Sequence, residues 1–265
     1  MTTYTGNKTA LVTGASHGIG FELAQNLLSN NWVVYGTGRD IQNLEKIKNH
    51  YPNFIPIQAD FTVNEDIERI ADIIKNSNLP LHLSVQNAGM KSPPRPLSKY
   101  DCNSIDEVFA VNLLAPMKLT ALTACLMPPE SRILYVTSRA ATLRLKESST
   151  YCASKAGLDE ITAIVRQELA ENNIGVTCII PGEVDTRIQK ILRETNTFHL
   201  HQRFREVYEK GQLISPKICA DFLKWFLCDL SFEEFKKSNM PTSIYDEWHH
   251  QYWLKSREQL PAFPF

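Results

Sequence analysis

The sequence of 265 residues lacks the features that mark several classes of protein. It has no concentrated basic run, and 28 basic side chains balance 29 acidic ones for a net charge of −1, so nothing indicates binding to nucleic acid or to an anionic membrane. No apolar stretch approaches the roughly 20 residues that span a bilayer. The first eight residues contain no hydrophobic core of a secretory signal, and we therefore expect a cytoplasmic protein with no membrane partner.

Paired cysteines and metal-ligand spacings are also missing. The six cysteines are scattered, with no Cys-x-x-Cys, which favours free thiols over disulfides or zinc. His199, His201 and the pair His249-His250 cluster loosely, but their spacing matches no ligand set, so we predict no metal site. With 43% hydrophobic and 22% charged residues, the chain has the composition of a soluble globular protein that buries one large core.

A glycine-rich turn follows the first apolar run of the chain, residues 8–13. A helical pattern of apolar residues comes directly after the turn. Strand, glycine turn and helix are the arrangement that places a diphosphate at a helix N-terminus, where free N–H groups and the helix dipole favour negative charge. A glycine cluster alone is weak evidence, but the flanking strand and helix favour nucleotide binding. The residues predicted to contact the nucleotide here are Gly14, Ser16, His17, Gly18, Ile19 and Gly20.

The residues after the second predicted strand, residues 32–37, indicate which dinucleotide is bound. NAD-preferring proteins place an acidic residue there to accept hydrogen bonds from the ribose diol, whereas this chain has Gly38 and Arg39. A guanidinium group clamps a 2′-phosphate, and His17 adds to the same pocket, so we predict NADP(H). Two alternatives stay open: the Asp40 carboxylate reaches the ribose after a small backbone shift, or Arg39 is an ordinary solvated turn residue.

Apolar runs continue to alternate with helical segments along the chain. Further strands are predicted at residues 54–58, 81–85, 133–137 and 175–180. This alternation predicts a single-domain Rossmann-like α/β fold over residues 1–265, with a doubly wound parallel sheet that binds its ligand at the carboxyl ends of the strands.

Two strand ends add cofactor candidates. Asp60 and Phe61 follow the third strand, and Asp60 is predicted to accept from an adenine amino group, to cap the helix that begins near Asn64, or both. The small residues of the run Asn87-Ala88-Gly89, after the fourth strand, let the chain lie close under a cofactor.

Tyr151 and Lys155 lie one helical turn apart, so their side chains leave the same face of the predicted helix. A lysine cation stabilises the phenolate and lowers the pKa of tyrosine from about 10 towards the working range. Ser138, at the end of the fifth predicted strand, is placed to polarise a carbonyl oxygen that Tyr151 protonates. A lone Tyr-x-x-x-Lys is more often a surface pair, and the other motifs are what favour catalysis.

Asn112 is an uncharged amide among apolar neighbours, inside a long helical region, residues 104–127, that we expect to be interrupted or kinked at Pro116. A buried amide needs hydrogen-bond partners. One interpretation is that Asn112 ties down this break in the helix.

Together these motifs resemble those of the short-chain dehydrogenase/reductase family over roughly residues 7 to 186. The resemblance implies that Tyr151 is the general acid/base, that Lys155 lowers its pKa and holds the nicotinamide ribose, and that Ser138 positions the carbonyl. It implies that Asn112 supports a water relay to Lys155. Gln86 departs from the family pattern, in which many members have a second Asn. The resemblance extends the cofactor site to the residues that close the sixth strand, Pro181, Gly182, Val184 and Thr186.

The C-terminal third is similar to that of the branch containing sepiapterin reductase and the bacterial benzil reductases, and lacks the final strand and Val-Asp-Gly-Gly-type tail of many members. Residues 187–214 are expected to form a helical substrate flap. The resemblance implies that Asp246, with Ser138 and Tyr151, binds substrate. The aromatic extension 247–265 is expected over the active site, on a neighbouring subunit or on its own domain.

These observations predict an NADPH-dependent carbonyl reductase that acts on a small-molecule ketone, aldehyde or diketone. The first alternative is an NAD(P)+-dependent alcohol dehydrogenase, because the same residues serve both directions. The second is a non-catalytic dinucleotide-binding regulator. The resemblance also implies a homodimer or homotetramer, since members of the family tend to pair through their long helices.

Overall fold

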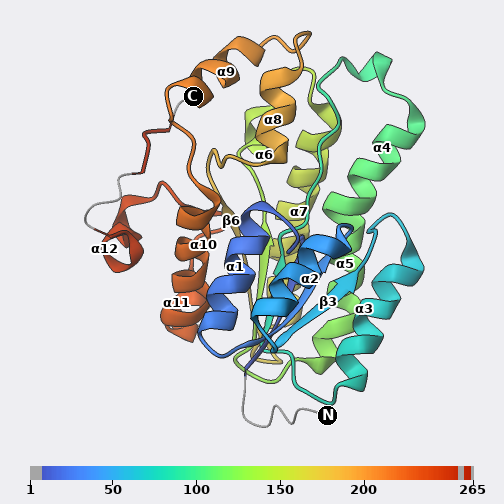
Figure 1. Ribbon diagram of the computed structural model, residues 1–265, viewed down its shortest axis with the longest axis vertical. Helices are drawn as coiled ribbons and strands as arrows, with labels where there is room; N and C mark the ends of the chain where they lie inside the picture. Colours follow the sequence, from blue (N-terminus) through green and yellow to red (C-terminus); the bar gives the residue numbers. More distant parts are fainter. Residues whose placement is uncertain (1–7, 256–259, 264–265) are drawn as a thin grey trace.

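The computed structural model describes residues 8–255 and 260–263, which form a single parallel sheet with helices on both faces (Figure 1). The sheet has seven strands in the order β3-β2-β1-β4-β5-β6-β7, so the chain builds outward on one side of β1 and then crosses to the other. This order confirms the predicted Rossmann-like, doubly wound α/β fold. The strands are β1 Thr9–Thr13, β2 Val33–Gly38, β3 Phe54–Gln58, β4 Leu83–Gln86, β5 Arg132–Val136, β6 Gly175–Ile180 and β7 Thr242–Ser243.

Helices connect successive strands and cover the sheet (Figure 1). The α-helices are α1 Gly18–Ser29, α2 Ile41–His50, α3 Asn64–Asn76, α4 Cys102–Phe109, α5 Ala115–Thr123, α6 Ala140–Leu143, α7 Ser149–Glu168, α8 Arg187–Glu194, α9 His201–Glu209, α10 Pro216–Lys224, α11 Phe232–Lys237 and α12 His250–Trp253. Short 3-10 and π-helical segments are η1 Leu97–Lys99, η2 Ala110–Leu114, η3 Ala124–Leu126, η4 Trp225–Asp229 and η5 Glu247–His249.

The hydrophobic core has two halves, one on each face of the sheet. On one face α1, α2 and α10 bury residues such as Leu23, Leu44 and Phe222. On the other, α3, α5 and α7 bury residues such as Ile70 and Leu158. Each fully buried aliphatic side chain contributes about 2 kcal/mol, and burial from both sides explains why the strands read as nearly continuous apolar runs.

The long helix before β5 deviates from α-helical geometry earlier than predicted. The irregular segment is the π-helical η2, whereas Pro116 lies in the first turn of α5. A proline ring collides with the carbonyl four residues before it in an α-helix, here that of Asn112. The wider π turn at Asn112 accommodates the ring, so the break precedes the proline.

The region Cys102–Leu126 is long and apolar enough, by length and composition, to cross a membrane. The sequence-based expectation that no stretch approaches this length was therefore wrong. Here one face of the region packs on the core, with Val108 and Leu119 buried and Thr120 hydrogen-bonded to the Tyr135 hydroxyl at 2.6 Å, while Leu114 and Leu122 are exposed. Such a one-sided helix is compatible with a Rossmann-type enzyme fold.

A final strand is present although the sequence lacks the usual tail. Thr242 and Ser243 pair in parallel with Ile179 and Ile180 of β6. The prediction that this chain has no such strand was wrong, because two residues are too few to show a strand pattern.

The described part of the aromatic extension packs on its own domain and reaches the cleft. Tyr252 stacks on Trp225 at 5.8 Å between ring centres, and the buried His249 stacks on Phe222 at 4.8 Å. Further on, the Phe263 ring centre lies 3.8 Å from the guanidinium carbon of Arg139. Residues 256–259 and 264–265 of the predicted extension lie outside the described residues.

Candidate active site

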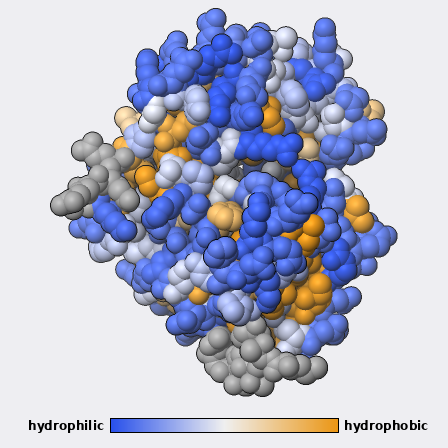
Figure 2. Space-filling view, in the orientation of Figure 1, coloured by the Kyte–Doolittle hydropathy of each residue, from blue (hydrophilic) through white to orange (hydrophobic). Residues whose placement is uncertain are grey.

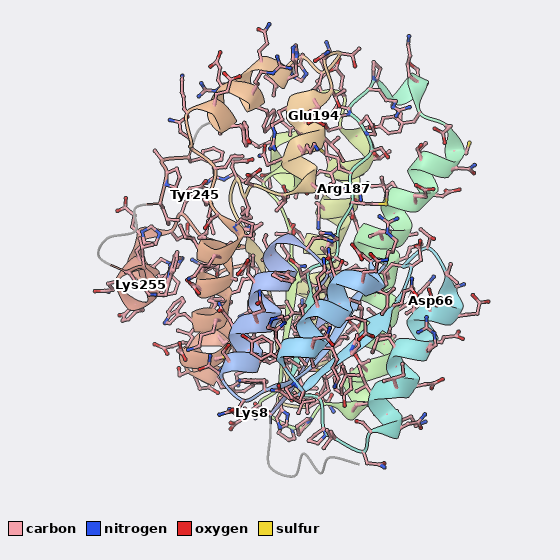
Figure 3. All side chains as sticks on the ribbon, viewed as in Figure 1. Lys8, Asp66, Arg187, Glu194, Tyr245 and Lys255 are labelled. Atoms are coloured by element: carbon pink, nitrogen blue, oxygen red, sulfur yellow. The ribbon has the colours of Figure 1, made fainter. Side chains whose placement is uncertain are left out.

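A cleft of about 830 Å³ opens where the strands end, between the sheet and α8. Figure 2 shows a mostly hydrophilic surface that is hollowed beneath the part carrying α8 and α9, with hydrophobic residues gathered in patches. In Figure 3, Arg187 lies at the end of α8 nearest the sheet and Glu194 at the far end. The predicted site residues that line the cleft are Gly14, Ser16, His17, Gly18, Ile19, Arg39, Asp60, Phe61, Asn87, Ala88, Gly89, Ser138, Tyr151, Lys155, Pro181, Gly182, Val184 and Thr186.

The glycine turn brings main-chain N–H groups to the cleft. Gly14 and Gly18 adopt φ angles of +70° and +58°, which other residues rarely tolerate. Gly20 does not line the cleft, but a Cβ there would lie 2.4 Å from the Gly14 carbonyl oxygen, so it keeps the turn tight. No side chain caps the first turn of α1. The free N–H groups and open space fit a dinucleotide diphosphate.

In the turn after β2, the side chains of Arg39 and of the adjacent Asp40 have different surroundings. Arg39 lines the cleft. Asp40 instead caps α2, accepting from the Asn43 N–H at 3.1 Å, and its other oxygen lies 3.4 Å from His17 Nε2. The Asp40 carboxylate is thus engaged by its own helix and by His17.

Asp60 does not cap the helix that follows it. Its Oδ1 accepts from the N–H and the hydroxyl of Thr62, at 3.0 and 2.8 Å, in a local turn. The residue that precedes α3 is Val63, whose side chain cannot cap, so that alternative was wrong. Asp60 lines the cleft, and its contact with an adenine amino group stays a prediction.

The run Asn87-Ala88-Gly89 is fastened to β1. The Thr13 hydroxyl accepts from the N–H groups of Asn87 and Ala88, each at 2.9 Å, and Asn87 Nδ2 donates to the Thr13 carbonyl at 2.8 Å. A Cβ on Gly89 would lie 3.8 Å from Lys155 Nζ. The small residues therefore bring the main chain under the cleft, close to the Lys155 ammonium.

Ser138, Tyr151 and Lys155 meet at the end of β5. The Ser138 hydroxyl lies near enough to Tyr151 to lower the pKa of the phenol. Lys155 Nζ donates to the carbonyl oxygen of Val136 at 2.8 Å, from one helical turn beyond Tyr151 on α7. Both α7 side chains are buried. The serine at the strand end and the pair on the next helix thus form one cluster, as the spacing indicated.

Burial dominates the electrostatics of this cluster. It raises the pKa of Tyr151 to about 12, which the Ser138 hydroxyl opposes and the Glu183 carboxylate reinforces. It lowers the pKa of Lys155 to about 8, against the Asp159 carboxylate. A phenol with this pKa keeps its proton at neutral pH, and efficient proton transfer requires a lower value, nearer the working pH. The lowering of its pKa by Lys155 stays a prediction.

The side chain of Asn112 hydrogen-bonds to Met90, which lines the cleft, and to Ser154 on α7. Its Oδ1 accepts from the Met90 N–H at 2.8 Å, and its Nδ2 donates to the Met90 carbonyl at 2.9 Å and to Ser154 Oγ at 3.0 Å. The amide therefore joins η2, the segment after β4 and α7. These bonds satisfy the buried polar atoms of Asn112. They agree with the interpretation that Asn112 fixes the interruption of the long helical region.

Asp246 is not among the residues that line the cleft. Its Oδ2 accepts from the Ser243 N–H at 2.9 Å, which closes the turn after β7. Tyr245, placed in Figure 3 on the side of the molecule that carries the C-terminal segment, is nearer the site, since its hydroxyl accepts from the Glu183 N–H at 3.3 Å. The predicted substrate contact of Asp246 stays a prediction.

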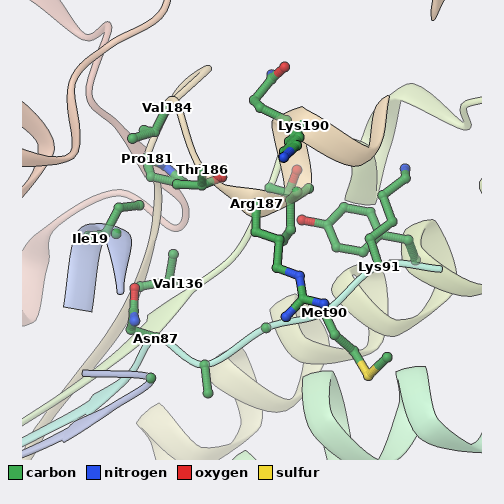
Figure 4. A pocket seen from close by; sticks show the side chains of 18 of the residues that line it. Ile19, Asn87, Met90, Lys91, Val136, Pro181, Val184, Thr186, Arg187 and Lys190 are labelled. Carbon is green, nitrogen blue, oxygen red and sulfur yellow. The ribbon is translucent and has the colours of Figure 1, made fainter. Parts of the chain in front are cut away.

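Sequence reasoning missed charged residues of the substrate side. Lys91 and Glu183 line the cleft, and the side-chain amide of Gln189 donates to Glu183. Burial raises the pKa of Glu183 to about 7. In Figure 4 the Arg187 side chain runs from the start of α8 across the cleft towards Met90. A signal was available: a charged residue directly follows Asn-Ala-Gly-Met, and another follows Pro-Gly.

Comparisons with known proteins agree with this geometry. A family model described as short chain dehydrogenase matches residues 8–197. A benzil reductase ((S)-benzoin forming) of Saccharomyces cerevisiae is 30% identical over 82% of this chain and 88% of its own length. A benzil reductase ((S)-benzoin forming) of Bacillus subtilis is 30% identical over 80% of this chain and 90% of its own.

Solved structures share the architecture. The KRED1-Pglu enzyme superposes with a TM-score of 0.78 at 26% identity, over 86% of this chain and 98% of its own. A short-chain dehydrogenase/reductase of Saccharomyces cerevisiae gives a TM-score of 0.83 at 23% identity, over 91% of this chain and 97% of its own. The second likeness, at this identity, bears on the fold alone.

Proposed function

Because the chain belongs to the short chain dehydrogenase family, and is an oxidoreductase acting on CH–OH or carbonyl groups, we propose that it is an NADPH-dependent carbonyl reductase. Its substrate is a ketone, aldehyde or diketone, which it converts to an alcohol. The observation that carries the proposal is the meeting of Ser138, the buried Tyr151 and Lys155, one helical turn beyond it, in a cleft that fits a dinucleotide.

In this mechanism Ser138 and Tyr151 bind the carbonyl oxygen of the substrate. The Ser138 hydroxyl donates a hydrogen bond that polarises the carbonyl, and Tyr151 transfers its proton to the oxygen as negative charge develops there. The reduced nicotinamide, when bound, supplies the hydride to the carbonyl carbon. Lys155 holds the nicotinamide ribose and stabilises the phenolate that Tyr151 becomes, while Asn112 keeps the surrounding main chain in place and supports a water relay to Lys155.

The residues after β2 support NADP(H) over NAD(H). Arg39 lines the cleft where the adenosine ribose would lie, and a guanidinium group pairs with a 2′-phosphate. Asp40 carries the carboxylate that would suit a ribose diol. One of its oxygens caps α2, and the other lies beside His17. His17 lies in the same pocket.

Residues 187–214 are proposed as a flap over the substrate. Helices α8 and α9 share a small core of their own, formed by Leu192, Phe198 and Phe204. Leu192, Phe204 and the partly buried Ile188 also line the cleft, which gives it an apolar side for the substrate. We propose a cytoplasmic enzyme of two or four identical subunits, and the exposed Leu114 and Leu122 of the long helical region support a subunit contact there.

The alternative of an NAD(P)+-dependent alcohol dehydrogenase uses the same residues in reverse. The proposed preference for NADP(H) is what argues against this alternative, because the same residues serve both directions. A non-catalytic regulator would bind the dinucleotide without needing the Ser138 hydroxyl beside the buried Tyr151.

One experiment separates these functions. NADPH consumption at neutral pH is followed at 340 nm with a panel of diketones, pterins and aldehydes, beside NADP+ reduction with the matching alcohols. The proposal expects faster turnover of at least one carbonyl compound than of its alcohol. Faster alcohol oxidation would favour the dehydrogenase, and tight NADPH binding without turnover of any compound would favour the regulator.

A further inference from the structure

Lys91 is a buried cation in the wall of the cleft to which the proposed reaction gives no role. It stands two residues after Gly89, lines the cleft, and is only 4% exposed. Its Nζ lies 4.6 Å from the centre of the Tyr151 ring and donates to Ser148 Oγ at 2.9 Å. Figure 4 shows Lys91 and Met90 on the same side of the cleft.

This ammonium group has no ion-pair partner in the part of the chain that the structure describes. Burial lowers its pKa to about 8, while Cys152 and Glu183 act on it only at longer range. Burying a charge without a partner is unfavourable, so such a group in a cleft wall is a candidate for contact with a ligand.

The hydrogen-bonding capacity of Lys91 is only partly used. An ammonium group has three N–H donors. One is directed to Ser148, and the face of the Tyr151 ring accepts the charge on a second side. A third donor is left for an acceptor atom beside Tyr151. Because Tyr151 and Ser138 hold the reacting carbonyl oxygen, a second oxygen on the adjoining carbon is the acceptor that a substrate would bring nearest.

We propose that Lys91 is a specificity-determining residue that donates a hydrogen bond to a second acceptor oxygen on the carbon next to the reacting carbonyl. The substrate class is therefore a 1,2-dicarbonyl compound or a 2-oxo carboxylate. Both offer this oxygen, and only the second carries a charge. Arg139 and Arg187, which line the same cleft, add positive potential on this side. The inference rests on the proposed carbonyl reduction and assigns the substrate requirement to one residue.

A purely structural role for Lys91 makes a different prediction. Ser148 is buried, directly precedes α7, and uses its hydroxyl for Lys91 and not for capping the helix. If Lys91 only supported the start of α7, every substrate would suffer equally from its loss. Ser148→Ala would then act like Lys91→Met, because each removes the same link.

The test compares three substrates that share a phenyl ring: 1-phenyl-1,2-propanedione, phenylglyoxylate and propiophenone. kcat/KM is measured with saturating NADPH for the wild type, Lys91→Met, Lys91→Arg and Ser148→Ala. A hydrogen bond to a charged donor corresponds to a loss of roughly 10- to 100-fold when it is removed. We expect Lys91→Met to lose that factor for the dione or the oxo acid and less than about 3-fold for propiophenone.

The remaining variants and outcomes decide the inference. Lys91→Arg, which keeps the charge and the donor, should recover most of the lost selectivity, and Ser148→Ala should leave the ratio of dione to propiophenone unchanged. A larger loss for phenylglyoxylate than for the dione would identify a carboxylate as the preferred acceptor. Equal losses for all three substrates, or no loss, would overturn the assignment. If the wild type consumes NADPH with none of a broad carbonyl panel, the proposed function itself fails.

Discussion

The Lys155 ammonium donates a hydrogen bond to the main-chain oxygen of Val136, 2.8 Å away, and so ties α7 to the end of β5. Two residues further along, the Ser138 hydroxyl lies close enough to Tyr151 to lower the pKa of the phenol. These two contacts place the tyrosine at the edge of the sheet. The geometry at the reacting centre therefore depends on contacts between one helix and one strand end.

Lys155→Met should remove both the helix tie and the cation beside the phenol. We expect kcat/KM for a good carbonyl substrate to fall by roughly 10²- to 10⁴-fold, the range typical of a lost acid–base contribution. Steady-state NADPH consumption checks this. Lys146→Met, at an exposed position before α7, is the matched control and should change the rate by less than about 2-fold. Near-normal turnover of the Lys155 variant would remove that residue from the mechanism.

Arg39→Ala should weaken NADPH binding selectively. A charge-assisted contact to the 2′-phosphate is worth roughly 1.5–3 kcal/mol, so the Kd for NADPH should rise by about 10- to 100-fold, while that for NADH changes little. Fluorescence titration measures both. Lys48→Ala removes a similar charge from a half-buried position of α2 that does not line the cleft, and serves as the control. Equal weakening of the two cofactors would contradict the assignment of Arg39.

Asn112→Ala should destabilise the protein through lost hydrogen bonds. The change leaves the N–H and carbonyl of Met90 and the Ser154 hydroxyl without their amide partner in a buried place. We expect the free energy of unfolding to fall by about 3 kcal/mol. Urea denaturation measures it, with Asn64→Ala at an exposed position as the control. A loss below about 0.5 kcal/mol would show that these bonds do not hold the cleft wall.

Glu183 should make stability depend on pH. Its pKa of about 7 in the folded chain lies above its ordinary value of 4.5, so between these values the folded chain keeps a proton that the unfolded chain has released. The stabilisation from this bound proton is fully present below pH 4.5 and is lost as the pH rises through 7. In the wild type the free energy of unfolding should therefore fall by about 2 kcal/mol between these pH values, after allowance for partial exposure of the carboxyl group. Glu183→Gln should remove this dependence on pH.

The measurement is the urea midpoint of both proteins from pH 4.5 to 8, with Glu209→Gln on the exposed face of α9 as the control. A wild-type curve parallel to that of the Glu183 variant would mean that the carboxyl group titrates near its ordinary value.

Much of the architecture follows from local patterns. The predicted bounds of β3 and β6 agree with the structure, because both strands are short apolar runs next to turn-forming residues. The structure also brings Ser138 beside Tyr151, which the sequence indicated from a strand end and a helical spacing. Such motifs combine short-range periodicity with a fixed edge of the sheet, and so they can be inferred without coordinates.

Other features depend on contacts between distant segments. The amide of Asn112 in the π-helical η2 bonds Met90, 22 residues earlier, and no local pattern encodes that pairing. The approach of Lys91 to Ser148 spans 57 residues, and the support of Arg139 by Phe263 brings the C-terminal segment to the cleft. The contacts of the charged groups on the substrate side are therefore visible only once the fold places them.

The most direct test of the account is the Tyr151→Phe variant, which removes one hydroxyl from a buried ring. Turnover of NADPH with the best carbonyl substrate is measured beside the Kd for NADPH in the same preparation. The account predicts that turnover falls by at least about 10²-fold while the Kd changes by less than about 3-fold. Turnover close to that of the wild type would contradict the assignment of Tyr151 as the proton donor.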